Sequence, residues 1–292
     1  MFSIIGITGR VGGGAAGLLL GMGKQVRAVV RDEARGHVWA SNGASVAVAD
    51  ITDGDSLGRA IAGSEAVFVM LPPLFDPSPG FPEAKRQIDS LSAALRQSEA
   101  KRIVALSTIG AHVTRPNLLN SLHMMEESFS QLPMPVTFLR PGWFMENHAG
   151  DVSSAISEGI IHSYLQPVEH AIPMIATKDI GALAGTLLLE SWQGKRIVEL
   201  EAKTRVSSAD IAATLTDILG KPVKAELVPR ARWEEVFRTQ SMKNPMPRIQ
   251  MIEGFNEGWI EFEGGREGSV KGQTSLKAVL EEMVRDARKE AA

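Results

Sequence analysis

The chain has 292 residues, of which 44% are hydrophobic and 22% charged, as in a globular protein with one large domain or a main domain and a smaller lobe. The net charge of -3 gives no general attraction to nucleic acid or anionic membranes, and the absence of cysteine excludes disulfides, thiolate metal sites and a cysteine nucleophile. No apolar run approaches the roughly 20 residues that cross a bilayer, and a glycine motif begins as early as Gly6, leaving no room for a signal peptide. We therefore expect a cytoplasmic protein.

The first half of the chain alternates short apolar runs with helix-length segments. The runs are nearly continuous, which is typical of parallel strands covered by helices on both faces. The expected strands are Phe2–Ile5, Gln25–Arg31, Ser45–Val48, Ala66–Leu71, Arg102–Ser107 and Val136–Leu139, and the expected helices are Val11–Met22, Ser56–Ile61, Pro82–Ser98 and Leu118–Gln131. This order predicts an α/β fold with a Rossmann-type, doubly wound parallel sheet.

After Pro141 the alternation becomes irregular. We expect residues 1–141 to form a dinucleotide-binding domain and residues 142–292 to form mainly a smaller C-terminal α/β lobe that binds the substrate. A strand near residues 196–201 is expected to extend the sheet of the first domain. Helices are expected at Ser207–Val223, Arg232–Thr239 and Ser275–Lys289, and a loop at Glu261–Gln273.

The first strand leads directly into the motif G-x-x-G-x-x-G, formed by Gly6, Gly9 and Gly12. Glycine permits a tight turn, a close approach of the backbone to a pyrophosphate, and close packing of helix on strand. The N-terminus of the following helix adds free N–H groups and the positive end of a dipole. The motif predicts a dinucleotide site that includes Gly6, Thr8, Gly9, Arg10, Val11 and Gly12; the alternative is a tight turn before a closely packed, glycine-rich helix.

The end of the second strand indicates which dinucleotide is bound. NAD-binding proteins usually carry an acidic residue there, which contacts the ribose hydroxyls, whereas this chain places Arg31 first and Asp32 after it. A guanidinium pairs well with a 2′-phosphate, so the sequence favours NADP(H), unless Arg31 is simply a solvated residue. Two later strand ends are expected to flank the cofactor, or to be ordinary loops: Asp50 with Ile51, and Leu71 with Pro72.

Six short segments occur along the chain in this order: GITGRVGG, VVRDEA, VADITD, MLPP, ALSTIGA and FLRPGWFMEN. In these segments the chain resembles the NmrA-like family, an atypical group of the short-chain dehydrogenase/reductase superfamily. The resemblance implies a Rossmann domain that prefers NADP(H) and a small C-terminal substrate lobe. The family includes NADPH-dependent reductases of quinones, carbonyls or aromatic ethers, and also non-catalytic sensors that regulate a partner protein.

The superfamily's usual catalytic pair, Tyr-x-x-x-Lys, is absent. Tyr164 is the one tyrosine of the chain, and no lysine lies between Lys101 and Lys178. Ser107 matches the family's strand-end serine. His123 is a candidate proton donor, because carboxylates three and four residues later share its helix surface and favour the imidazolium. The alternative is a histidine packed on a helix face.

A partly aromatic segment follows the strand that ends near residue 139. An apolar wall with an amide suits a flat, largely apolar ligand, although the same residues would also anchor the lobe. The expected substrate residues are Trp143, Phe144, Met145 and Asn147. No metal-binding spacing is visible, and a homodimer is compatible with this size. We expect hydride transfer from NADPH to a small quinone, carbonyl or similar acceptor; the alternative is a non-catalytic NADP(H)-sensing regulator of a partner protein.

Overall fold

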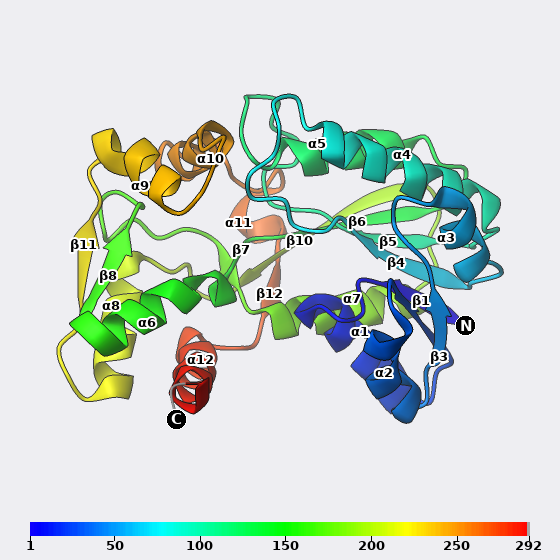
Figure 1. Cartoon of the computed structure of the whole chain (residues 1–292), viewed down its shortest axis with the longest axis horizontal. Coiled ribbons are helices and arrows are strands. Elements are labelled where there is room, and N and C mark those ends of the chain that lie inside the picture. The colour runs from blue at the N-terminus through cyan, green and yellow to red at the C-terminus, as the bar shows by residue number, and fades with distance from the viewer. Residues whose placement is uncertain (291–292) are drawn as a thin grey trace. The chain divides into compact units, whose positions relative to one another are not determined.

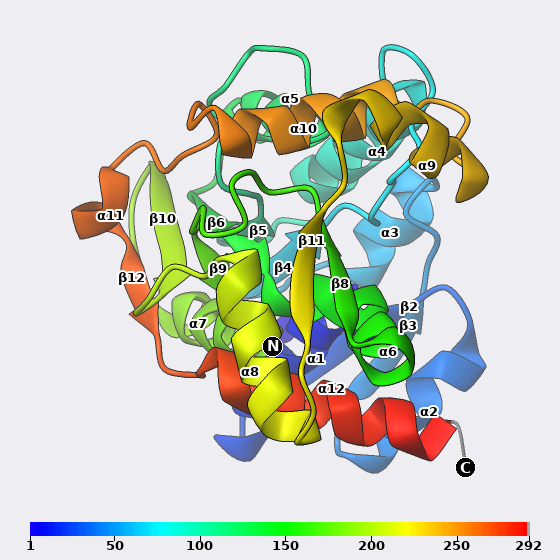
Figure 2. The same cartoon turned by 90° about the vertical axis from the view of Figure 1, so that its left-hand side faces the viewer.

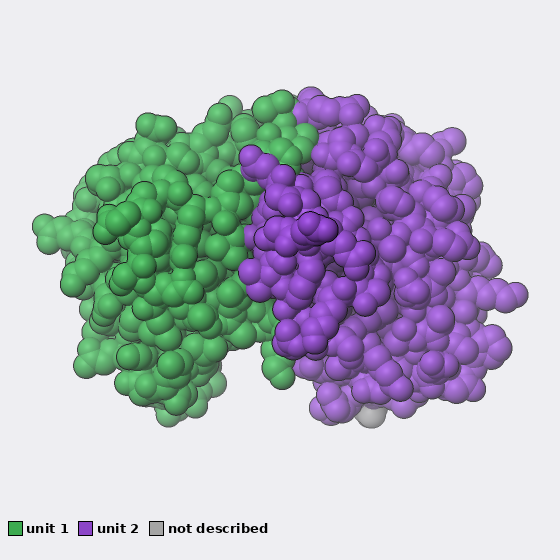
Figure 3. Space-filling view, turned by 180° about the vertical axis from the view of Figure 1, so that it is seen from behind, with its two compact units in different colours: residues 1–114, 119–140, 178–198 green, residues 115–118, 141–177, 199–292 purple. Residues whose placement is uncertain are grey.

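The computed structural model describes residues 1–290, which form two compact units (Figure 3). Unit 1 comprises Met1–Thr114, Leu119–Arg140 and Lys178–Val198, and unit 2 comprises residues 115–118, 141–177 and 199 onward. The chain therefore passes between the units at more points than the one boundary expected near residue 141. Unit 1 also includes the segment Lys178–Val198, which leads into the strand that was expected near residues 196–201 to extend the sheet of the first domain.

An eight-stranded sheet has the order β12-β10-β6-β5-β4-β1-β2-β3 (Figure 1). The neighbours from β3 to β6 pair in parallel, and so do β10 and β12. The strands are β1 (Phe2–Ile5), β2 (Val26–Val30), β3 (Ser45–Val48), β4 (Ala66–Met70), β5 (Ile103–Leu106), β6 (Val136–Pro141), β10 (Lys195–Ala202) and β12 (Val270–Gly272). The strand order reverses direction between β1 and β4, which is where a Rossmann sheet opens a crevice for a dinucleotide. The predicted fold class is confirmed.

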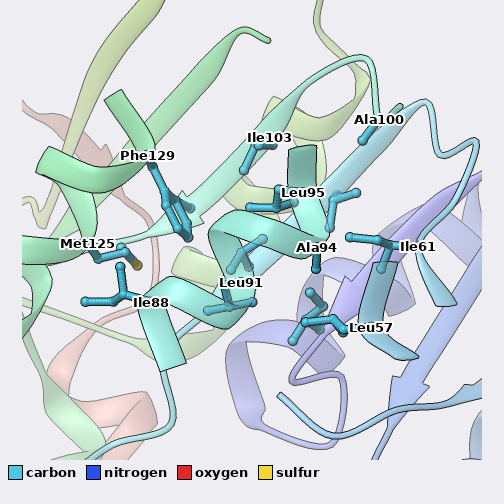
Figure 4. Close-up of a cluster of buried hydrophobic side chains, with 14 of the residues drawn as sticks. Leu57, Ile61, Ile88, Leu91, Ala94, Leu95, Ala100, Ile103, Met125 and Phe129 are labelled. Carbon is cyan, nitrogen blue, oxygen red and sulfur yellow. The ribbon is translucent and has the colours of Figure 1, made fainter. Parts of the chain in front are cut away.

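The strands of unit 1 are covered by helices on both faces. Figure 1 shows α3, α4 and α5 on one face and α1, α2 and α7 on the other. Their bounds are α1 (Arg10–Gly21), η1 (Glu33–Gly36), α2 (His37–Ser41), α3 (Gly54–Ala60), α4 (Pro82–Gln97), α5 (Asn120–Ser130) and α7 (Thr177–Leu189). On the first face a buried apolar cluster joins sheet and helices, with Leu57 from α3, Leu91 from α4 and Phe129 from α5 (Figure 4). The strand residues between those of the cluster are buried as well, and burial on both faces explains why these strands read as continuous apolar runs.

Helices α1 and α7 approach each other through glycines. A Cβ added to Gly181 would lie 2.9 Å from the Cα of Gly14, so neither position has room for a side chain. The close contact places α7 against the helix that follows the glycine motif. This packing explains why Lys178–Val198 belongs with unit 1.

Unit 2 contains two small parallel sheets, β8 with β11 (Figure 2) and β7 with β9. Its helix α8 begins at a capping box formed by Ser207 and Asp210 and ends at Gly220, which has φ +67°. The elements of unit 2 are β7 (Trp143–Phe144), η2 (Met145–His148), α6 (Ala149–Glu158), β8 (Ile160–Ser163), β9 (Met174–Ile175), α8 (Ser208–Leu219), β11 (Lys224–Leu227), η3 (Arg230–Arg232), α9 (Trp233–Thr239), α10 (Met246–Asn256), α11 (Gly265–Gly268) and α12 (Leu276–Glu290).

The expectation of a loop over Glu261–Gln273 is wrong. The segment contains α11 and the edge strand β12, which pairs with Leu200–Ala202 of β10. The fully buried carboxylate of Glu201 accepts hydrogen bonds from Ser269 (2.7 Å) and Lys271 (2.8 Å), and these long-range bonds hold the short strand in place. Three residues are too few for a periodicity signal. No helix within residues 1–290 is long and apolar enough to span a membrane.

Candidate active site

The glycine motif forms a tight turn between β1 and α1. Gly6 has φ +80°, a conformation that favours glycine, and its carbonyl oxygen accepts a hydrogen bond from the N–H of Gly9 (3.0 Å). A Cβ on Gly12 would lie 2.4 Å from that same oxygen, and a Cβ on Gly9 would lie 3.3 Å from it. The backbone of the turn therefore packs tightly on itself, and a side chain on Gly12 would displace the carbonyl group of Gly6.

The turn presents the N-terminus of α1. Gly9 is the N-cap, no side chain caps it, and the first turn holds no acidic residue. The leading N–H groups of a helix have no partner within the helix and attract anions. Thr8 and Arg10 are exposed, whereas the side chain of Val11 is buried, so Val11 can offer a ligand only its backbone. This cradle of backbone donors fits a dinucleotide pyrophosphate.

The other expected cofactor residues follow the carboxyl ends of neighbouring strands in unit 1. Arg31 is exposed after β2, and Asp32 is occupied as the cap of η1, where its carboxylate accepts from the N–H of Ala34 (2.9 Å). Asp50 follows β3, and hydrogen bonds from the hydroxyl and the N–H of Thr52 hold its pKa below 3.8, with a smaller contribution from the charge of Arg31. Ile51 is half-buried, and β4 is followed by buried Leu71 and exposed Pro72. Parallel strands bring all of these positions to one edge of the sheet.

Ser107 lies just after β5 and is part of a buried polar network. Its hydroxyl donates to Oε1 of Glu126 (2.5 Å), and Arg140 donates to both carboxylate oxygens of Glu126 at 2.9 and 2.6 Å. The side chains of Glu126 and Arg140 are 10% and 4% exposed, so the ion pair is well shielded from water. The hydroxyl proton of Ser107 is therefore committed to a carboxylate. Its oxygen can still accept a hydrogen bond.

His123 is positioned by α5 and the preceding loop. Its Nδ1 lies 2.7 Å from the carbonyl oxygen of Ala111, and its Nε2 lies 3.5 Å from a carboxylate oxygen of Glu127. The expectation that both following glutamates face His123 is wrong for Glu126, which points inward to Arg140. The packing of Arg140 at the end of β6 decides this, and helical spacing alone does not report it. The catalytic role of His123 stays a prediction.

The expected substrate residues occupy different environments within unit 2. Trp143 and Asn147 line a cavity of about 590 Å³, the size of many small-molecule sites. Phe144 is half-buried, and Met145 is only 1% exposed, so its side chain belongs to the core. A substrate role therefore fits Trp143 and Asn147 better than it fits Met145.

The cavity wall also contains a histidine–aspartate pair. His148 and Asp151 lie three residues apart where η2 passes into α6, and Nδ1 of His148 is 2.6 Å from Oδ2 of Asp151. The other ring nitrogen, Nε2, is buried with no hydrogen-bond partner among residues 1–290. Both residues line the cavity. An imidazole oriented by a carboxylate with its second nitrogen unpaired is the arrangement of a general acid or base. The H-x-x-D spacing at a helix start is the signal in the sequence that could have revealed this pair.

Comparisons with known proteins support the prediction from the glycine turn that the chain binds a nicotinamide dinucleotide. The family model described as NAD(P)H-binding matches residues 6–163. The chain is 25% identical over 225 residues to the NAD(P)H azoreductase of Xenophilus azovorans, covering 77% of this chain and 76% of that protein. It is 24% identical over 241 residues to quinone oxidoreductase 2 of Escherichia coli strain K12, covering 82% of each.

The fold is also similar to that of the NADPH-dependent quinone oxidoreductase of Escherichia coli solved with NADPH. The TM-score is 0.81 with 20% sequence identity, covering 97% of this chain and 99% of that chain. The protein belongs to the NAD(P)H-binding family, because the family model matches more than half of the chain. The expected family and the expected nicotinamide cofactor are therefore confirmed.

Proposed function

We propose that the protein is an NADPH-dependent reductase that passes a hydride to a small, flat, largely apolar acceptor such as a quinone or carbonyl. The observation that carries the proposal is the turn in which Gly12 lies against the carbonyl of Gly6 and leaves the N-terminus of α1 uncapped. The relatives named azoreductase and quinone oxidoreductase support the reaction class. An azo compound and a quinone share a planar, conjugated acceptor.

The residues at the end of β2 support NADPH as the reductant. The nearest carboxylate, Asp32, already accepts a backbone hydrogen bond, so it is poorly placed to hold a ribose diol. The exposed guanidinium of Arg31 can donate two parallel hydrogen bonds to a 2′-phosphate. Arg31 would hold the phosphate that distinguishes NADPH from NADH.

When bound, NADPH supplies a hydride, and reduction of a carbonyl or quinone oxygen to a hydroxyl needs a proton as well. His148 is the first candidate donor, because Asp151 orients its ring and both residues line the cavity. His123 is the second candidate, with Nδ1 bonded to the backbone of Ala111. Ser107 would act by accepting a hydrogen bond, since its proton is held by Glu126.

Turnover with a panel of acceptors tests the reductase. NADPH oxidation is followed under anaerobic conditions with a quinone, an azo compound and an aromatic aldehyde, using the parent protein, His148→Gln and His123→Gln. We expect acceptor-dependent oxidation by the parent and a kcat about 100-fold lower in the variant that lacks the proton donor. Intact NADPH binding without oxidation by any acceptor would contradict the proposal.

Two observations favour a second candidate function: the hydroxyl of Ser107 already donates its proton to Glu126, and the catalytic Tyr-x-x-x-Lys pair is missing. In this alternative the protein is an NADP(H) sensor that regulates a partner protein and catalyses no reaction. A sensor must bind NADP⁺ and NADPH with different affinities, because a ligand shifts an equilibrium only through differential binding. A large difference between the two affinities, without turnover, would support the sensor.

A further inference from the structure

The cavity of unit 2 is lined by a cation that forms no ion pair with a carboxylate among residues 1–290. Arg248, in the first turn of α10, lines the cavity and is half-buried. Its guanidinium lies 4.6 Å from the centre of the Phe237 ring, and one nitrogen is 3.8 Å from the sulfur of Met242. In the part of the chain that the structure describes, Arg248 forms no ion pair with a carboxylate. Burial lowers the pKa of Arg248, which reflects the cost of holding this charge away from water.

Two other charged residues on the cavity wall, Asp151 and Arg232, have side-chain partners. Asp151 is bonded to His148 at 2.6 Å. Arg232 is exposed and lies 3.6 Å from a carboxylate oxygen of Glu235. Arg248 is thus a cavity cation without a carboxylate partner among the described residues, which makes it the group that can pair with one anionic group of a ligand.

Neutral hydrogen-bonding groups share the cavity wall with Arg248. Tyr164 lines the cavity between the rings of Trp233 and Phe237, and burial raises the pKa of its phenol above 10.0, so the phenol stays protonated at neutral pH. The side-chain amide of Gln240 also lines the cavity. A carboxylate placed against Arg248 would have this hydroxyl and amide beside it.

The rest of the wall combines polar residues, among them Asn147 and His162, with apolar and aromatic ones. Trp143, Ile161, Leu165, Val236 and Ile252 contribute to it. The indole Nε1 of Trp143 is buried with no hydrogen-bond partner among the described residues.

From this arrangement we infer that the cavity of unit 2 binds a planar aromatic acid with one negative charge, whose anionic group is held by Arg248 beside Tyr164. The cavity of about 590 Å³ accommodates two or three fused or linked rings. Binding of the acid depends on unit 2 alone. That this acid is the acceptor reduced by NADPH rests on the proposed function.

Calorimetric titration without cofactor tests the inference. The probes are 2-naphthoate and its neutral analogue 2-naphthamide, and the proteins are the parent, Arg248→Gln, Arg248→Lys and Arg238→Gln. Arg238 is a control because it lies on α9, is exposed, and pairs with Glu234 outside the cavity lining. We expect the parent and Arg238→Gln to bind the carboxylate at least tenfold more tightly than the amide.

In Arg248→Gln we expect this preference to disappear while affinity for the amide stays at the parent value, which shows that the cavity is intact. Arg248→Lys keeps the charge and is expected to retain part of the preference. Equal binding of the two probes by the parent, binding of neither, or a preference that survives in Arg248→Gln would overturn the inference. Because no NADPH is present, failure of this titration is separate from failure of the acceptor panel. Turnover without a carboxylate preference would reject the aromatic acid and keep the reductase.

Discussion

Substitution of Gly12 by alanine places one methyl group at the point on which the cofactor proposal depends. The added Cβ would lie 2.4 Å from the oxygen and 2.8 Å from the carbonyl carbon of Gly6, which are backbone atoms that cannot rotate away. Inserting a methyl group into a closely packed site costs about 1–3 kcal/mol. If the turn relieves the clash by opening, the cradle loses its shape. We expect Gly12→Ala to bind NADPH about 5- to 150-fold more weakly, which corresponds to the same energy range.

Gly17 provides a matched control on the same helix. It is exposed, and a Cβ added there would meet nothing within 4 Å. Alanine is favoured over glycine inside a helix by about 1 kcal/mol, so Gly17→Ala should unfold at or above the temperature of the parent and bind NADPH equally well. Thermal unfolding and NADPH titration of both variants provide the comparison. If Gly12→Ala binds NADPH and unfolds like the parent, the close contact between Gly12 and Gly6 is not needed for the cofactor site.

Three further predictions concern single side chains. Arg31→Ala should weaken NADPH about 10- to 150-fold, the value of a charge-assisted hydrogen bond, and leave NADH affinity unchanged; equal losses for both would exclude a role in recognising the 2′-phosphate. Glu126→Gln removes the charge bonded to buried Arg140 and should cost about 3–5 kcal/mol of unfolding free energy in urea, whereas Glu127→Gln, at an exposed neighbour, should cost less than about 1 kcal/mol. Burial acts to raise the pKa of Glu201, but hydrogen bonds from Lys271 and Ser269 and the charge of Arg205 outweigh it and hold that pKa below 4.5. A depressed pKa stabilises the fold above the unfolded value and loses this effect as the pH falls through the folded value, so Tm below pH 4.5 should fall less steeply in Glu201→Gln than in the parent.

The parallel sheet could be predicted because its signals are local. Each central strand is a short, continuous apolar run, and the glycines follow the first one at a fixed spacing. The helix at Ser208–Leu219 was equally readable, since a capping serine begins it and a glycine ends it. In these segments local preference and tertiary structure agree.

The rest depends on contacts between distant residues. The strand at Val270–Gly272 is held by bonds to Glu201 about 70 positions earlier, and no local pattern reports that. Glu126 and Glu127 are adjacent in sequence, but one is buried against Arg140 and the other is exposed beside His123. Nothing in the sequence marks Arg248. It stands out because it lines a cavity and has no carboxylate partner among the described residues, and both features depend on the folded chain.

Titration of the parent protein with NADPH, NADP⁺, NADH and NAD⁺ tests whether the chain binds a nicotinamide dinucleotide and prefers the form with the 2′-phosphate. We expect saturable binding of NADPH at least tenfold tighter than that of NADH, because Arg31 and the cradle at α1 recognise the phosphates. Binding of none of the four, or equal binding of NADPH and NADH, would contradict it.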